Sequence, residues 1–352
     1  MTLHTIDLGD RKIGHSEPCF IIAEAGVNHD GSLETALQLV DVAVDAGADA
    51  VKFQTYTAGL VVSENAPKAA YQMETTDTSE SQLDMAKRLE LPYDAFRRIK
   101  DYCEERGIIF ISTPFDLEAA DFLDELDVVA FKTPSGEVVN IPYLDHIARK
   151  GKPMIVSTGM SKIGEVETAV ATIKAAGNDE IVLLHCVSNY PTDPADVNLR
   201  AMATMSSAFG LLVGFSDHTL GIEVTVAARA LGACVIEKHY TLDRGRSGPD
   251  HGSSLEPDEL GAMVRGIRKV EVALGDGRKE PAASEANTSD VARRSLLSAA
   301  AIPAGTVLTK DLIAILRPGT GLPPAMRDQV IGMRARQHID PGVLLSLAML
   351  EW

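Results

Sequence analysis

Two histidines, His218 and His239, end apolar, β-rich runs of the chain, LLVGFSDH and ACVIEKHY. Neighbouring strands of a sheet lie about 5 Å apart, so both imidazoles can reach one ion if these runs pair. Imidazole and oxygen ligands suit manganese, iron, cobalt or zinc, and leave positions for water and a substrate oxygen. We therefore expect both histidines to bind a divalent metal. Asp250, in the following loop, is then a further ligand, a supporting partner or only a turn residue.

Two lysines and two glutamates end other apolar runs. Lys52 and Lys132 are compact cations, and two of them in so acidic a chain indicate a site for an anionic, oxygen-rich ligand. Glu24 and Glu137 end runs in which burial can raise a carboxyl pKa toward the range useful for proton transfer. Both glutamates are candidate catalytic residues, and the alternative is that they only form salt bridges with the lysines.

Uncharged polar side chains occupy the remaining run ends, where they can hydrogen-bond a polar substrate. They are Gln54, Thr113, Ser135, Ser157, Ser188, Tyr190 and Ser216. A set of this kind requires a scaffold that brings the ends of many strands to one place.

The scaffold is predicted from eight short apolar runs, near residues 20, 51, 109, 131, 155, 183, 213 and 236. Each run is followed by a turn and an amphipathic stretch, and several stretches end at the glycine typical of a helix C-terminus. Continuous apolar strands indicate a parallel sheet covered by helices. Eight repeats without a Gly-rich dinucleotide motif predict a (β/α)8 TIM barrel of the α/β class, whose active sites lie at the C-terminal ends of the strands.

The organisation along the chain is predicted from shifts in composition. We expect the barrel in residues 1–275, a linker rich in Gly, Pro and Ser in 276–290, and a small β-rich domain in 291–352. The segment 56–91 is too long for an ordinary βα loop. It is either a functional lid, a subunit-contact insertion or a simple surface excursion.

The net charge and the cysteines restrict the kinds of binding partner and the cellular compartment that we expect. The formal net charge of −17 means that nucleic acid and anionic membranes would be repelled over most of the surface. The four cysteines form no CxxC pair and lie mostly in apolar runs, which is typical of buried thiols in a reducing compartment. The N-terminus lacks a signal pattern, and no apolar run approaches the ~20 residues of a membrane helix. We expect a cytoplasmic protein without a nucleic-acid or membrane partner.

The residues at the run ends form recognisable sequence blocks. In chain order these are AEAGVNHDGS, VKFQT, STPFD, FKTPSGE, STGM, LHCVSNYPT, GFSDHTLG and EKHYTLDRGRSGPDHGSSLEP. They resemble the signature blocks of the sialic acid synthase family over nearly the whole chain. The tail LTKDLIAILRPGTGL resembles that family's C-terminal antifreeze-like (SAF, β-clip) domain.

The resemblance implies condensation of phosphoenolpyruvate with N-acetylmannosamine and water, giving N-acetylneuraminate and phosphate. The alternative acceptor is 2,4-diacetamido-2,4,6-trideoxymannose, which gives N,N'-diacetyllegionaminate. It also implies a divalent metal, most commonly manganese, with magnesium or cobalt as alternatives, held by His218 and His239. The resemblance further implies a homodimer in which the antifreeze-like domain of one subunit covers the barrel of the other. Arg317 is then expected to reach the sugar bound by the partner subunit.

The resemblance also implies roles for the other residues. Lys52 and Lys132, with hydroxyl groups at Thr113, Ser135, Ser157 and Ser216, are expected to hold the phosphate and carboxylate of phosphoenolpyruvate. Gln54, Tyr190 and Asp250 are expected on the sugar side with Glu24, and Glu137 beside the reacting carbons.

Two other functions are alternatives to the predicted sialic-acid-type synthase. A condensation that uses a phosphorylated sugar would need a cationic cluster for the distal phosphate, and only Arg317 and the pair Arg244 and Arg246 are candidates. A non-catalytic carbohydrate-binding protein would have no need for lysines and carboxylates at buried strand ends.

Overall fold

The computed structural model describes residues 5–352 and divides the chain into two compact units, Met1–Gly275 and Asp276–Trp352. We call them the barrel unit and the C-terminal unit. Within residues 5–352, no helix has the length and apolar character that crossing a bilayer requires.

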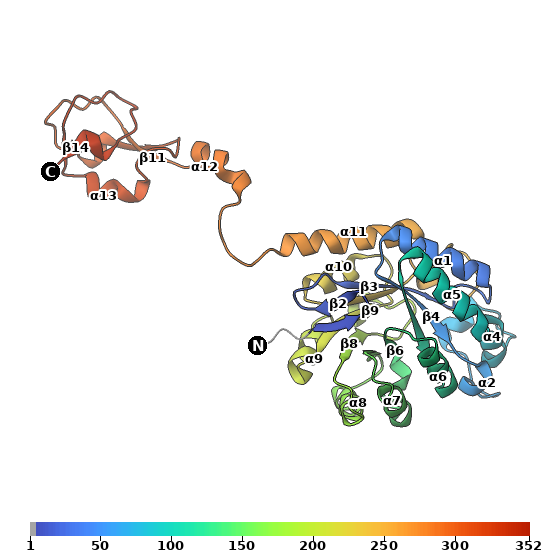
Figure 1. Cartoon of the computed structure of the whole chain (residues 1–352). Coiled ribbons are helices and arrows are strands. Elements are labelled where there is room, and N and C mark those ends of the chain that lie inside the picture. Colours follow the sequence, from blue (N-terminus) through green and yellow to red (C-terminus); the bar gives the residue numbers. More distant parts are fainter. Residues whose placement is uncertain (1–4) are drawn as a thin grey trace. The chain divides into compact units, whose positions relative to one another are not determined.

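Eight parallel strands form the centre of the barrel unit, in the order β5-β4-β3-β10-β9-β8-β7-β6 (Figure 1). The outermost strands of this order, β5 and β6, also pack against each other, so the sheet comes round on itself. The predicted (β/α)8 barrel is confirmed. The strands are β3 (Phe20–Gly26), β4 (Ala50–Thr55), β5 (Ile109–Pro114), β6 (Phe131–Thr133), β7 (Met154–Ser157), β8 (Ile181–Cys186), β9 (Leu212–Asp217) and β10 (Val235–His239).

Helices alternate with these strands and cover the outer face of the sheet. Two of them end as predicted at glycines in the left-handed region, Gly47 (φ 79°) and Gly107 (φ 73°), a conformation that costs glycine little. The helices are α1 (Leu33–Ala46), α5 (Tyr93–Arg106), α6 (Leu117–Glu125), α7 (Ile141–Ala148), α8 (Ile163–Ala175), α9 (Ala201–Phe209), α10 (Glu223–Ala230) and α11 (Pro257–Leu274).

An N-terminal hairpin, β1 (Thr5–Leu8) and β2 (Arg11–Gly14), completes the barrel unit. Its buried side chains Ile6, Leu8 and Ile13 belong to one apolar cluster with residues of β3 to β10 such as Ile155 and Val235. A separate, larger cluster lies between the strands and the helices. The hairpin therefore adds apolar contacts with strands from both halves of the barrel unit.

The segment 56–91, which we call the lid, contains three short helices, α2 (Ala58–Val61), α3 (Ala70–Thr75) and α4 (Gln82–Leu89). Only a few of its side chains, such as Met85 and Leu89, are buried. Polar contacts hold its turns together: Lys68 donates to the side chain of Thr76 and lies 3.5 Å from a carboxylate oxygen of Glu80. The lid follows β4 and thus starts at the C-terminal end of a barrel strand.

The C-terminal unit has an apolar core of its own, formed by residues such as Leu296, Ile302, Leu308 and Leu345. Its strands pair antiparallel as β11 with β12 and β13 with β14. Its elements are α12 (Ala286–Ala292), β11 (Ser295–Ser298), β12 (Ile313–Leu316), α13 (Arg327–Val330), β13 (Arg334–Ala335) and β14 (Leu350–Glu351).

Candidate active site

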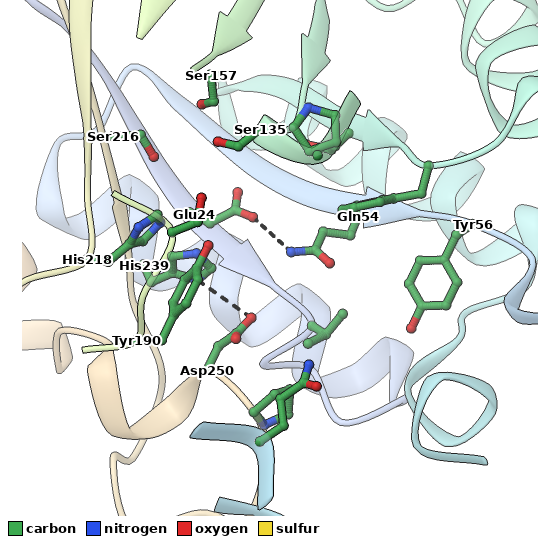
Figure 2. Close-up of a pocket in the computed structure, with 18 of the residues that line it drawn as sticks. Glu24, Gln54, Tyr56, Ser135, Ser157, Tyr190, Ser216, His218, His239 and Asp250 are labelled. Atoms are coloured by element: carbon green, nitrogen blue, oxygen red, sulfur yellow. Dashed lines mark hydrogen bonds and ion pairs between the residues drawn. The ribbon is translucent and has the colours of Figure 1, made fainter. Parts of the chain in front are cut away.

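A cavity of about 320 Å³ lies among the C-terminal ends of the barrel strands, beside the lid. Figure 2 shows side chains from several strands pointing into it. Most of the residues predicted from run ends line this cavity: Glu24, Lys52, Gln54, Thr113, Lys132, Ser135, Ser157, Ser188, Tyr190, Ser216, His218, His239 and Asp250.

One predicted site residue of the barrel unit does not line this cavity. Glu137 is absent from the cavity lining, and its carboxylate accepts a hydrogen bond from Asn140 at 2.5 Å. Strand β6 is only three residues long, and the chain then enters a 3-10 turn, Ser135–Glu137, that carries this glutamate away. Arg317 is an exposed residue of the C-terminal unit.

A row of alternating buried charges crosses the cavity. Lys52 Nζ lies 2.6 Å from Glu24 Oε2 and 3.7 Å from Glu237 Oε2, and Lys132 Nζ lies 3.3 Å from Glu237 Oε1. The side chains of all four residues are at most 5% exposed. We call these residues the charged row. The outer carboxylate, Glu24, is aimed by a β-bulge at Gly26, whose φ of 54° favours glycine.

Burial and mutual attraction oppose each other in the charged row. Burial raises the pKa of Glu24 to about 7, although Lys52 favours its ionised form. Burial also lowers the pKa of Lys132, and the attraction of Glu237 only partly offsets this. Burial alone would raise the pKa of Glu237, but Lys132 and Lys52 lower it below its ordinary value. Glu24 is thus the member suited to proton transfer near neutral pH, and Glu237 remains a carboxylate.

Glu237 is a residue of the site that the run-end rule missed. It lies inside the run VIEKH rather than at its end, two residues before His239. Successive strand residues point to opposite faces, so Glu237 and His239 share the face that lines the cavity. Alternation within the run was the signal that could have identified it. Cys186, predicted only as a buried thiol, also lines the cavity.

Hydroxyl groups beside the charged row can receive an anion. Ser157 Oγ is buried and has no hydrogen-bond partner in the described part of the chain, although it lies in a polar cavity. Ser135 Oγ accepts from the backbone N–H of Gly159 at 3.0 Å. A Cβ atom on Gly159 would lie 2.8 Å from Ser135 Oγ, so glycine permits this close approach. Thr113 accepts from Lys52 at 2.9 Å.

The two imidazoles meet at the cavity, with ring centroids 5.4 Å apart (Figure 2). His218 Nδ1 lies 2.7 Å from the carbonyl oxygen of Val187, which leaves Nε2 for another ligand. His239 Nδ1 is buried without a hydrogen-bond partner among residues 5–352 and lies 3.9 Å from Asp250 Oδ2. Burial lowers the pKa of His239 well below its ordinary value, which favours the neutral ring.

This donor set fits a divalent metal. Neutral imidazole nitrogen is a metal ligand, and a buried ring nitrogen without a partner is costly unless something binds it. In the described part of the chain, no three histidine, cysteine or acidic side chains form a metal site by themselves. Two imidazoles would therefore leave coordination positions to water and substrate, as in a catalytic site.

Aromatic and acidic side chains border the imidazole pair. The ring of Tyr190 lies 4.1 Å from that of His218 and 5.0 Å from that of Tyr71 in the lid. Burial raises the pKa of Asp250 to about 6. The loop that carries Asp250 is anchored by His251, whose Nε2 lies 3.0 Å from Asp30 Oδ1.

The sequence matches the NeuB family over residues 39–279 and the SAF domain over residues 293–351. The chain belongs to the NeuB family. Two N,N'-diacetyllegionaminic acid synthases are each 45% identical to it. The one from Legionella pneumophila matches over 347 residues, 97% of this chain and 98% of the relative. The one from Campylobacter jejuni matches over 320 residues, 90% and 96%.

A solved structure of a sialic acid synthetase is also similar to this NeuB-family chain. The N-acetylneuraminic acid synthetase of Leptospira borgpetersenii, in complex with citrate, superposes with a TM-score of 0.73 and 39% identity, covering 81% of this chain and 95% of that one. The predictions of a sialic-acid-type synthase and of a C-terminal antifreeze-like domain are confirmed by these matches.

Proposed function

We propose that this chain condenses phosphoenolpyruvate with an N-acylated amino sugar and water, giving a nine-carbon 2-keto sugar acid and phosphate. The observation that carries the proposal is the convergence of two buried lysines, two imidazoles and several hydroxyl groups on one cavity at the strand ends of a barrel. The names of the relatives from Legionella and Campylobacter support the same reaction class.

Phosphoenolpyruvate carries a phosphate and a carboxylate, which need cations and donors. Lys52 and Lys132 supply the buried positive charge, and Thr113, Ser135, Ser157 and Ser216 supply hydroxyl donors around it. Glu237 favours the protonated form of both lysines and holds them close together before the substrate arrives. This arrangement orients the enol phosphate before any bond is made.

The reaction forms a bond between C3 of phosphoenolpyruvate and the aldehyde carbon of the sugar, and adds water at C2. The bond between C2 and the oxygen of the phosphate group then breaks in the tetrahedral adduct, and phosphate leaves. Glu24, whose pKa burial raises to about 7, accepts one proton of the attacking water at its carboxylate and passes it to the former aldehyde oxygen, which becomes a hydroxyl group. The second proton of that water leaves with phosphate as the C2 ketone forms. Lys52 stabilises the carboxylate form of Glu24 during this step.

His218 and His239 would hold a divalent ion, for which we propose manganese, with magnesium and cobalt as alternatives. Such an ion supplies Lewis-acid polarisation of the aldehyde oxygen. Tyr190 and Asp250, which border the imidazoles, orient the hydroxyl groups of the sugar, and Gln54 does so from the side of Glu24.

For the acceptor we propose 2,4-diacetamido-2,4,6-trideoxymannose, which makes the product N,N'-diacetyllegionaminate, in preference to N-acetylmannosamine. The lid wall of the cavity is largely apolar and includes Val61, Val62 and Met85. Such a wall suits the methyl groups of a deoxy sugar with two acetamido groups. Among the described residues, Lys52 and Lys132 are the only lysines or arginines that line the cavity, so within one subunit a second phosphate on the sugar would find no cation beyond the two lysines assigned to phosphoenolpyruvate.

We also propose that the enzyme works in the cytoplasm as a homodimer, in which Arg317 of one subunit reaches the sugar bound by the other. The family resemblance supports this assembly. Mixing an Arg317→Ala chain with a chain that lacks an essential lysine tests it, because a mixed dimer would regain one complete site.

A direct assay tests the proposed reaction. The purified chain is incubated with phosphoenolpyruvate, manganese and each sugar, and phosphate release and product mass are measured. We expect turnover that is lost in His218→Ala and His239→Ala, whereas His146→Ala, which removes an imidazole paired with Asp121 on the outer helices, retains it. No phosphate release with either sugar, or full activity of both variants at the site, would contradict the proposal.

A further inference from the structure

A fully buried ion pair lies directly behind the two imidazoles. Lys238 Nζ is 2.7 Å from Asp217 Oδ2, and both side chains are 0% exposed. Asp217 immediately precedes His218, and Lys238 immediately precedes His239. The pair therefore joins the two strands at the same level as the proposed metal ligands.

Alternation along the strands places this pair on the opposite face from the cavity. Ser216 and His218 line the cavity on either side of Asp217, and Glu237 and His239 do so on either side of Lys238. Asp217 and Lys238 consequently point toward the helical layer. They are also direct partners in the pairing of β9 with β10, so a single cross-link fixes the register there.

The hydrogen bonds of the pair extend to the turn after His218. Asp217 Oδ1 accepts from the backbone N–H of Thr219 at 2.9 Å, and Lys238 donates to the carbonyl oxygen of Thr219. Asp217 Oδ2 also accepts from the hydroxyl of Thr225 in α10. His218 is thus held between two backbone segments that are both tied to β10.

Stability alone gives a weak reason for this arrangement. Removing two charges from water costs about as much as their attraction returns, and apolar side chains of similar volume are often as stabilising. What an apolar pair cannot reproduce is the directed set of bonds from Lys238 and Asp217 to the Thr219 backbone. The ion pair therefore contributes mainly by fixing the position of the Thr219 backbone.

We propose that Asp217 and Lys238 are positioning residues that set the spacing of His218 and His239 and so determine the affinity of the site for a divalent ion. This inference rests on the proposed metal-dependent function, and it concerns residues that touch neither metal nor substrate. Losing the cross-link would let β9 and β10 shift, and the imidazoles would no longer meet one ion in a common geometry.

The test is a double variant, Asp217→Asn with Lys238→Met, which removes both charges and keeps volume and the acceptor for Thr219. Cobalt affinity and the cobalt visible absorption spectrum are measured without substrates, together with thermal unfolding of the metal-free protein. We expect a folded barrel whose cobalt affinity is reduced by about tenfold or more, with a changed spectrum.

The matched control is Asp49→Asn with Arg268→Met, which removes another pair with a 2.7 Å contact, at the start of β4 rather than at the strand ends that carry the imidazoles. It should change unfolding without changing cobalt affinity or spectrum. If the double variant fails to fold, Lys238→Arg, which keeps the charge but not the length of the side chain, should still weaken cobalt binding.

The outcomes separate this inference from the proposed function. In one outcome, His218→Ala and His239→Ala abolish cobalt binding, but the Asp217 and Lys238 variants leave its affinity and spectrum unchanged. This result overturns the positioning role alone. A wild-type protein in which the histidine variants do not alter ion binding overturns the proposed metal site and this inference with it.

Discussion

Replacing Glu237 with Gln tests whether the charged row depends on the carboxylate at its centre. Glu237 lies 3.3 Å from Lys132 Nζ and 3.7 Å from Lys52 Nζ. With an effective dielectric constant of about 20, each attraction amounts to about 4.5–5 kcal/mol. Removing the carboxylate also removes its own desolvation cost, several kcal/mol, so the net loss of folding free energy is about 3–5 kcal/mol. That is a large part of a typical stability of about 5–15 kcal/mol.

The assay is thermal unfolding of Glu237→Gln with and without inorganic phosphate. We expect the barrel transition to fall by roughly 6 °C or more. Phosphate should raise it more in the variant than in the wild type, because the anion replaces the missing negative charge between the two lysines. Asp145→Asn, which removes an exposed carboxylate 2.8 Å from Arg149, is the control and should change neither quantity. A Glu237→Gln protein that behaves like this control would refute the reasoning.

Three further predictions follow from other parts of the structure. Val61→Lys places a cation on the lid wall of the cavity and should raise the kcat/KM for N-acetylmannosamine 6-phosphate, relative to the unphosphorylated sugar, by about fivefold. Burial lowers the pKa of His29 to about 4, so the unfolded state binds a proton between pH 6.5 and 4 that the native state does not. The free energy of unfolding should therefore fall by about 3 kcal/mol on acidification over that window. The His29→Gln variant should lack this loss. Ile13→Ala should destabilise the barrel unit by about 2–5 kcal/mol in denaturant unfolding.

Each of these predictions has a matched control. Leu60→Lys adds the same charge to an exposed neighbour that does not line the cavity, and an equal rise in the phosphosugar ratio there would contradict the lid prediction. For His29, the wild-type and variant curves are compared at each pH, because the raised pKa of Glu24 acts in the opposite direction in both proteins. A parallel pH dependence would be inconsistent with a neutral buried ring. Val272→Ala, at an 86% exposed position, should leave unfolding unchanged.

Much of the barrel and most of the site could be predicted from the sequence, because continuous apolar runs mark buried parallel strands and all eight strands end at one face. That rule is sufficient for His218 and His239, which follow long runs. It failed for Glu137, because a strand of three residues leads directly into a turn that no apolar pattern marks. It also missed Glu237, because a charged residue inside a strand is identified by its alternation with His239 and not by a run end.

The hairpin at residues 5–14 was not anticipated for a different reason. Its two strands are four residues long and half polar, so the local pattern is weak. Its apolar side chains become meaningful only through contacts with Ile155, Val235 and other residues far away in sequence. Information of this kind lies in the tertiary structure, and a local pattern cannot supply it.

That same hairpin has a consequence for how the protein is made. Ile6, Leu8 and Ile13 are synthesised before the barrel strands, yet their partners include Val235 in β10, the last of those strands to be synthesised, and Cys234 just before it. The hairpin can therefore complete its apolar contacts only after the chain has been synthesised as far as residue 235. Contacts between such distant segments slow folding and leave intermediates open to aggregation. Slow translation at low temperature, or a chaperone that shields residues 5–14, should accordingly improve the yield of folded protein.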